Sequence, residues 1–346
     1  MKLCSGAKGH AGETFVFSCL YLFAGHRRKA ELREAIRIAV AEAAAATGLS
    51  LECKFEEVDL QIGGDDHNLL VASRRDAYLS RISVREFDFV PASPPCNTIT
   101  RVQFANGIGP SPVRSLQYPF GFPWNDAAAQ EKCDVGTTLM AFGVQALQAC
   151  AQASRREPWR RTCGLLEHPE DLGEAQRGDP AAIWQFKETQ ELELSHGYRR
   201  GAVYQCELAE VDYAKPTGLI SDVPDSWGFM ALGWPMFEER GEARRSYRGP
   251  LSRKCACGRR HEGLVRRPQD QAFRTTNTAA WPWGMCMAIA KAAVADWLRR
   301  LCAHTGLHAA GMDDASAVRR PEHLAGVIEI SPDAPPSSSI RGAPHS

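Results

Sequence analysis

The chain has no net charge and no hydrophobic run long enough to span a membrane. Its 41 basic residues balance 41 acidic ones, which argues against a histone-like polyelectrolyte but leaves room for a local basic patch. The apolar stretch 15–25 is short, and His26-Arg27-Arg28-Lys29 follows it instead of a small-residue cleavage site. We therefore expect an intracellular protein of the nucleus or cytoplasm that is not secreted, is a monomer and has no membrane partner.

The sequence also lacks any CxxC pair, although it has 12 cysteines. A thioredoxin-like redox protein is therefore disfavoured, and a chain of this length does not need disulfide staples, so reduced thiols are expected. Cys255, Cys257 and His261 place three potential zinc ligands within seven residues. A tetrahedral site needs a fourth ligand, which is not nearby in sequence, and Cys206 is a distant alternative. We predict no metal here.

Segments typical of strands and helices alternate along the chain. The strand-like segments are 15–23, 51–58, 87–92, 163–167 and 202–206, and the helix-like ones are 29–47, 68–80, 131–155 and 283–301. This alternation predicts an α/β fold with a doubly wound, mostly parallel, Rossmann-like sheet. Residues 221–271 lose the alternation and gain Trp, Pro, Gly and Arg, which indicates a small second domain or an insertion.

A Pro-Pro-Cys turn follows the strand-like segment 87–92. Two consecutive prolines cannot continue a sheet ladder, because neither has a backbone donor. The chain must leave the sheet there, and it presents Cys96 at the carboxyl end of the strand, where ligands bind in open α/β sheets. Cys96 is therefore either a nucleophile, which as a thiolate is strong near neutral pH, or an ordinary buried cysteine at a turn.

Short motifs with this chemistry occur in a fixed order: Leu20–Gly25, Glu57–Asp59, Pro94–Thr98, Leu165–Pro169 and Thr275–Pro282. In that order the chain resembles the cytosine-C5 methyltransferases, which are class I enzymes that use S-adenosylmethionine. The resemblance extends over residues 15–300 and is greatest to divergent members of that family. It implies the same doubly wound fold and a DNA (cytosine-5-)-methyltransferase activity.

The resemblance implies a set of residues that bind S-adenosylmethionine: Phe23, Ala24, Gly25, Glu57, Asp59, Pro94 and Asn277. Glu57 would accept hydrogen bonds from the ribose hydroxyls, although a solvated acid at a strand end is the alternative. The pattern departs from the family at two glycines. The glycine expected two residues after Gly25 is missing, and Thr276 stands where a glycine precedes the asparagine.

The catalytic residues that the resemblance implies are Cys96 and Glu167. In such a reaction the thiolate adds to C6 of cytosine, which makes C5 nucleophilic enough to take a methyl group. The carboxyl group of Glu167 would contact N3 and the exocyclic amine of the base. His168 replaces the usual asparagine after the glutamate. An acid that begins a helix beside Pro169 is the alternative reading of Glu167.

The resemblance also implies a nucleic-acid partner, DNA rather than RNA, with the target base rotated out of the duplex. Arg114 lies in the Gly- and Pro-rich loop 97–126, where it contacts either a phosphate or only solvent. Arg259 and Arg260 lie in a very basic segment that suits contact with a phosphate backbone, although a solvated loop has the same composition.

The expected organisation has five parts: an N-terminal tail (1–14), a catalytic domain (15–220), a target-recognition region (221–271), a return to the catalytic domain (272–305) and a largely disordered tail (306–346). The alternative function is a catalytically inactive nucleic-acid-binding or scaffold protein that retains this fold. The missing glycines after Gly25 and before Asn277 favour that alternative.

Overall fold

The computed structural model describes residues 13–23, 30–105, 110–156, 160–240, 244–264, 278 and 280–306. Most of the predicted N-terminal tail and nearly all of the predicted C-terminal tail lie outside these ranges. No helix in the described ranges is long and apolar enough to cross a bilayer.

A seven-stranded mixed sheet in the order β2-β1-β3-β4-β6-β5-β7 forms the centre of the molecule. Neighbouring strands among β2, β1, β3 and β4 pair in parallel, whereas β6 is antiparallel to both β4 and β5. A separate two-stranded sheet is formed by β8 and β9. The strands are β1 (Thr14–Leu22), β2 (Ser50–Val58), β3 (Phe89–Ala92), β4 (Cys163–Pro169), β5 (Arg199–Tyr204), β6 (Pro216–Ser221), β7 (Ala231–Leu232), β8 (Met236–Arg240) and β9 (Arg244–Gly249).

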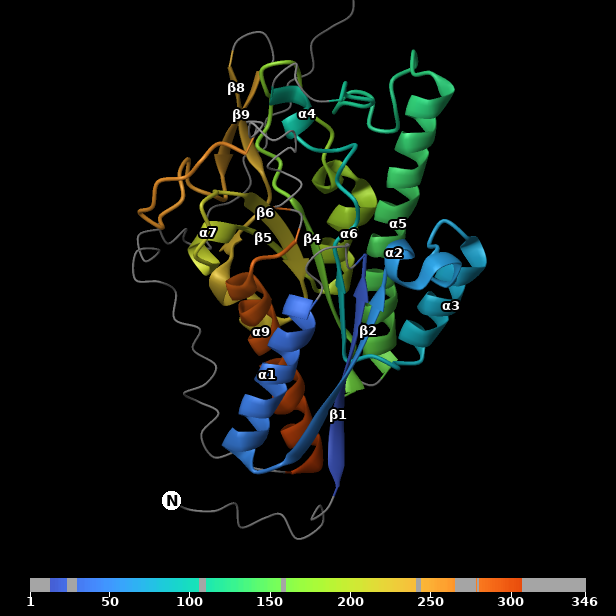
Figure 1. The fold of residues 1–346 in the computed structure, drawn as a ribbon, viewed down its shortest axis with the longest axis vertical. Helices are drawn as coiled ribbons and strands as arrows, with labels where there is room; N and C mark the ends of the chain where they lie inside the picture. Colours follow the sequence, from blue (N-terminus) through green and yellow to red (C-terminus); the bar gives the residue numbers. More distant parts are fainter. Residues whose placement is uncertain are drawn as a thin grey trace, which may run out of the picture.

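Helices cover both faces of the main sheet. Figure 1 shows α1 and α9 side by side on one face, with α3 and α5 together on the other. The helices are α1 (Ala30–Thr47), α2 (Leu60–Gly63), η1 (Gly64–His67), α3 (Ala72–Ser83), α4 (Val102–Ala105), α5 (Ala127–Arg156), η3 (Ile183–Gln185), α6 (Lys187–His196), α7 (Gln205–Leu208), η4 (Pro224–Phe229) and α9 (Trp283–Thr305).

The hydrophobic pattern of β1 explains this three-layer arrangement. Phe17 and Tyr21 of β1 pack into the core under α1 and α9, whereas Leu20 and Leu22 pack into the core under α5. Successive side chains of a strand point to opposite faces, so a strand that is apolar at every position is buried on both sides. The parallel strands are therefore covered by helices on both faces, as the sequence predicts.

The carboxyl end of α1 follows the expected capping chemistry. Helix α1 stops at Gly48, which adopts a φ of 71° and donates its amide to the carbonyl of Ala44 at 2.8 Å. Only glycine takes this left-handed conformation without strain, and it closes the helix here as the sequence predicts.

The α/β fold and the mostly parallel centre of the sheet are confirmed. The main sheet continues beyond residue 221, because η4 packs beside α9 and β7 pairs with β5. What stands apart from the main sheet is the β8–β9 hairpin and the loop 250–264, at the end that also carries α4 (Figure 1).

The start of α9 touches the end of α7 at Gly284. A Cβ added to Gly284 would lie far inside van der Waals contact with the carbonyl oxygen of Leu208. We expect Gly284→Ala to lower the free energy of unfolding by about 1–3 kcal/mol, because the two backbones would have to separate. Gly263→Ala is the matched control, since its Cβ meets nothing within 4 Å. Urea unfolding of both variants measures the effect, and equal stabilities would contradict this packing.

Candidate active site

Cys96 lies just beyond the carboxyl end of β3. The sheet ladder continues one residue past the strand, where the amide of Ser93 donates to the carbonyl of Leu22 at 3.2 Å. Pro94 and Pro95 then turn the chain away, and the Cys96 carbonyl accepts the Ile99 amide at 3.0 Å in a tight turn. The side chain of Cys96 is thus presented at the strand end predicted from the Pro-Pro pair.

Glu167 comes to this turn from the neighbouring strand. Strands β3 and β4 are parallel with Ala92 opposite Leu166, so the residues that follow these two lie together at the carboxyl edge. Glu167 is 4% exposed, and its Oε2 accepts the hydroxyl of Ser93 at 2.5 Å. Its Oε1 is buried and accepts no hydrogen bond within the described ranges. A buried acceptor of this kind is ready to bind a ligand donor.

Lys215, directly before β6, supplies the positive charge of the site. Its Nζ lies 3.9 Å from Oε1 of Glu167 and donates to the carbonyl of Thr278 at 2.9 Å. The sequence alone did not lead us to assign either Lys215 or Ser93, although Ser93 stands inside the Pro-Ala-Ser-Pro-Pro-Cys run. The antiparallel placement of β6, which brings Lys215 to this edge, has no signal in the local sequence.

Burial and two neighbouring charges act in opposite directions on the pKa of Cys96. Burial raises the pKa of the Cys96 thiol, the ammonium of Lys215 lowers it, and the carboxylate of Glu167 raises it. The net direction is upward, so the thiol is protonated at neutral pH in this state. A nucleophilic thiolate therefore depends on Lys215 and on any further positive charge that a ligand brings.

His168 occupies the opposite face of β4 from Glu167. It is 1% exposed and lies against Trp184, with the ring centroids 6.5 Å apart in an edge-to-face arrangement. Burial, Lys215 and Arg114 lower the pKa of His168 to about 3, so the ring is neutral at physiological pH. Neither ring nitrogen has a hydrogen-bond partner among the described residues.

The residues predicted to bind the cofactor that the structure describes include Phe23, which follows β1, and Glu57 and Asp59 at the end of β2. Phe23 has a φ of 61°, and its amide donates to the carbonyl of Val58 at 3.0 Å. This left-handed, non-glycine conformation turns the chain sharply at the strand end. The next residues predicted to bind the cofactor, Ala24 and Gly25, lie outside the described residues, as does Asn277.

Glu57 and Asp59 are placed beside this turn, at the end of β2. The Oε2 atom of Glu57 accepts a hydrogen bond from Arg33 of α1, whereas its buried Oε1 accepts none among the residues described. One carboxylate oxygen is therefore held in place while the other is left for a ligand donor, which suits a ribose hydroxyl. Asp59 is the first residue after β2, and its backbone carbonyl accepts the Gly63 amide at 3.1 Å.

Gly143 of α5 lies next to both the Pro-Pro-Cys turn and the end of β1. A Cβ at this position would meet Leu166, Phe23 and Pro94 at 3.4–3.6 Å. Pro94 is buried at this contact and was predicted to bind the cofactor. The structure therefore brings Phe23, Pro94 and Cys96 into one region, beside the β4 strand that carries Glu167.

Arg114 does not have the exposed position that its predicted contact with nucleic acid requires. Its side chain is fully buried, and its guanidinium donates to Thr98 and to the hydroxyl of Thr137 at 2.9 Å. It also reaches the carbonyl of Pro119 at 3.3 Å. Its donors are thus used to fasten the loop after Cys96 to α5, so Arg114 is a structural residue of the site.

The two other predicted nucleic-acid contacts have different environments. Arg259 is half-buried and donates to the carbonyls of Cys206 and Ala209, which close the end of α7. Arg260 is exposed, as are Arg253 and Lys254 nearby. A phosphate backbone can therefore be contacted by Arg260 but not by the buried guanidinium of Arg114.

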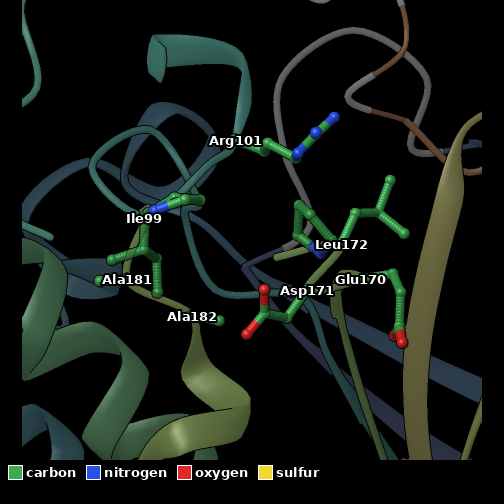
Figure 2. Close-up of a pocket in the computed structure, with 9 residues that line it drawn as sticks. Ile99, Arg101, Glu170, Asp171, Leu172, Ala181 and Ala182 are labelled. Carbon is green, nitrogen blue, oxygen red and sulfur yellow. The ribbon is translucent and has the colours of Figure 1, made fainter. Parts of the chain in front are cut away.

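A hollow beside this site lies between the loop after Cys96 and the segment that follows β4. Figure 2 shows the carboxylates of Glu170 and Asp171 diverging at its wall. Both carboxylates are already paired: Glu170 with the buried Arg200 and with Tyr247 at 2.9 Å, and Asp171 with Arg245 at 3.1 Å. The hollow is therefore part of the packing that supports the site, and its acids are not open to a substrate.

Comparisons with known proteins add no relative. No model of a known protein family matches the chain, and no curated protein matches it in sequence.

The charges around Cys96 predict the pH dependence of its alkylation. We expect Lys215→Met to raise the pKa of Cys96 further and slow its reaction with iodoacetamide, and Glu167→Gln to do the opposite. At a pH below the pKa of Cys96, a change of one unit in that pKa alters the thiolate fraction, and hence the alkylation rate, about tenfold. The measurement is peptide mapping by mass spectrometry across a pH series.

Lys291→Met is the matched control, because the ammonium of Lys291 pairs with Glu42 at 3.0 Å on the α1–α9 side. A Lys215→Met variant with the same pH profile as Lys291→Met would show that Lys215 does not act on Cys96.

Proposed function

We propose that the protein is an S-adenosylmethionine-dependent methyltransferase that methylates C5 of cytosine in DNA. The observation that carries the proposal is the meeting of Cys96, Glu167, Ser93 and Lys215 at the carboxyl ends of adjacent parallel strands. A thiol and a carboxyl group side by side are the two groups that this chemistry needs.

The order of the strands supports the same class. Two strands, β6 and β7, run opposite to β1–β5, and β6 is inserted between β4 and β5. An antiparallel strand inserted between parallel strands near one edge of the sheet is typical of class I methyltransferases. In open sheets of this kind the ligand lies at the carboxyl ends of the central strands, here β1, β3 and β4, next to the edge strand β2.

The described residues fit a nucleoside cofactor at the ends of β1 and β2. The buried, unpartnered Oε1 of Glu57 would accept the ribose hydroxyls, while Phe23 and Pro94 would form the wall nearest Cys96. When bound, S-adenosylmethionine supplies the methyl group that C5 receives. Its positive sulfonium charge would also oppose the upward shift in the pKa of Cys96 that burial causes.

The reaction then follows from the residues at the turn. Cys96 loses its proton, and the thiolate forms a bond to C6 of a cytosine rotated out of the duplex. Glu167, held by Ser93, contacts N3 and the exocyclic amine and stabilises the charge that develops on the ring. After C5 has taken the methyl group, a base removes the C5 proton, the C5–C6 double bond forms again, and the bond to sulfur breaks.

Covalent trapping tests the proposal directly. DNA that contains 5-fluorocytosine cannot lose a proton from C5, so the enzyme should remain bound to it through Cys96 when S-adenosylmethionine is present. We expect a covalent adduct between the protein and the DNA with the wild type and none with Cys96→Ser. Glu167→Gln should form it about a hundred-fold more slowly or worse, as expected for loss of an acid–base group.

Cys53→Ser is the matched control, because Cys53 is a half-buried cysteine on β2 that should not affect trapping. If no adduct forms with DNA, the same experiment with RNA and a titration of S-adenosylmethionine follow. Binding of the cofactor without any adduct would favour the inactive nucleic-acid-binding protein, and absence of cofactor binding would overturn the methyltransferase assignment.

The positions of the arginines predict different effects of their removal. Arg260→Ala should weaken DNA binding and lower the slope of log affinity against log salt by about one, because one exposed phosphate contact is lost. Arg114→Ala should instead lower the stability of the fold by about 2–5 kcal/mol, because buried hydrogen bonds and packing are lost. Fluorescence anisotropy titrations and urea unfolding separate the two effects.

Arg37→Ala serves as the charge-matched control, since Arg37 pairs with Glu34 on the surface of α1. Equal affinity and an equal salt slope for Arg260→Ala and Arg37→Ala would contradict a role for Arg260 in binding.

A further inference from the structure

The structure supplies the fourth ligand that the sequence motif Cys255-x-Cys257 with His261 lacks. Cys206 lies in α7, directly after β5, and the loop 250–264 folds back over it. One ligand atom from each of Cys206, Cys255, Cys257 and His261 lies within 4.8 Å of all the others. Residues separated by about fifty positions in the chain thus converge on one point, which a loop with only solvated side chains would not require.

The ligand atoms of this cluster are close enough together to share one metal ion, and the distance between two of the sulfur atoms is close to that of a tetrahedral site. The sulfur atoms of Cys255 and Cys257 are 3.6 Å apart, and Cys257 Sγ is 3.0 Å from Nε2 of His261. Sulfur–zinc bonds of about 2.3 Å in a tetrahedron place two sulfur atoms about 3.8 Å apart. Three thiols and an imidazole are also the ligand types that select zinc over the oxygen-binding cations.

The surroundings of the cluster show what such a metal would hold. The loop 250–264 has no helix or strand, and side chains and isolated backbone groups attach it to the β5–α7 segment. The Ala256 amide donates to Glu207 at 2.7 Å, the Tyr204 hydroxyl donates to the carbonyl of Ser252 at 3.0 Å, and Arg259 donates to the carbonyls of Cys206 and Ala209. Gly258, with a φ of 70°, makes the turn between the Cys-x-Cys pair and His261. A metal cross-link would lower the conformational entropy of such an irregular loop further.

We propose that Cys206, Cys255, Cys257 and His261 bind one zinc ion as a closed structural site. All four tetrahedral positions are taken by protein ligands, so no position is open for a substrate or water. Cys206 is buried and the other three are half-buried, which places the ion at the base of the loop. The zinc fastens the exposed basic residues Arg253, Lys254 and Arg260 to the main sheet, and the proposal does not depend on the reaction at Cys96.

The test is the metal content of the full chain, purified without chelators and measured by inductively coupled plasma mass spectrometry. We expect one zinc per chain in the wild type, loss of that zinc in Cys206→Ser and Cys257→Ser, and its retention in Cys53→Ser. Zinc that is absent from the wild type, or that remains in Cys206→Ser, would overturn the proposal.

A second measurement on the unaltered protein guards against variants that fail to fold. After exchange of the metal for cobalt, a tetrahedral thiolate site should give intense ligand-field absorption in the red and a thiolate-to-cobalt charge-transfer band in the near ultraviolet. X-ray absorption at the zinc edge should show three sulfur ligands and one nitrogen. A spectrum typical of octahedral oxygen ligands, or a disulfide between Cys255 and Cys257 in place of the metal, would contradict the site.

Discussion

The parallel pairing of β3 with β4 is the constraint on which the site depends. Ala92 stands opposite Leu166, so the turn that carries Cys96 leaves the sheet beside Glu167, which is still within β4. Successive side chains of a strand alternate between faces, so a slip of one residue in β4 would turn Glu167 to the face that now holds His168. The hydrophobic residues on both faces of β4 hold this register, since Leu165 and Leu166 are buried in opposite cores.

Buried charge fixes the parts of the site that the sheet does not reach. Arg114 ties the loop after Cys96 to α5, and Arg200 pairs with Glu170 where neither side chain is exposed. Removing one partner of such a pair leaves an uncompensated charge in a medium that solvates it poorly, so the pair tolerates little movement. The segments on either side of Glu167 are thus held by buried ion pairs and hydrogen bonds. Removing one partner of such an interaction destabilises the fold by more free energy than the intact interaction contributes.

The sequence predicts the strands and helices well where the signal is local. The continuous apolar run of β1, the glycine after α1 and the Pro-Pro turn before Cys96 each follow from the chemistry of neighbouring residues, and each is confirmed in the structure. What depends on distant contacts could not be read in the same way. Arg114 looks like a surface arginine until its loop folds onto α5, and Lys215 reaches Glu167 only because β6 enters the sheet between two earlier strands. Cys206, which the sequence offers only as a distant alternative, meets Cys255 and Cys257 because the loop 250–264 folds back over α7.

The position of β6 has a consequence for the way the chain is made. In space it lies between β4 and β5, but it follows both of them in sequence. A chain that has emerged from the ribosome only as far as β5 therefore has a gap in its sheet, with unpaired backbone groups on β4 and on β5. Open strand edges of this kind pair readily with other chains. A strand synthesised after both of its neighbours thus closes the interior of the sheet, and until it does so the incomplete protein is most exposed to aggregation and most in need of a chaperone.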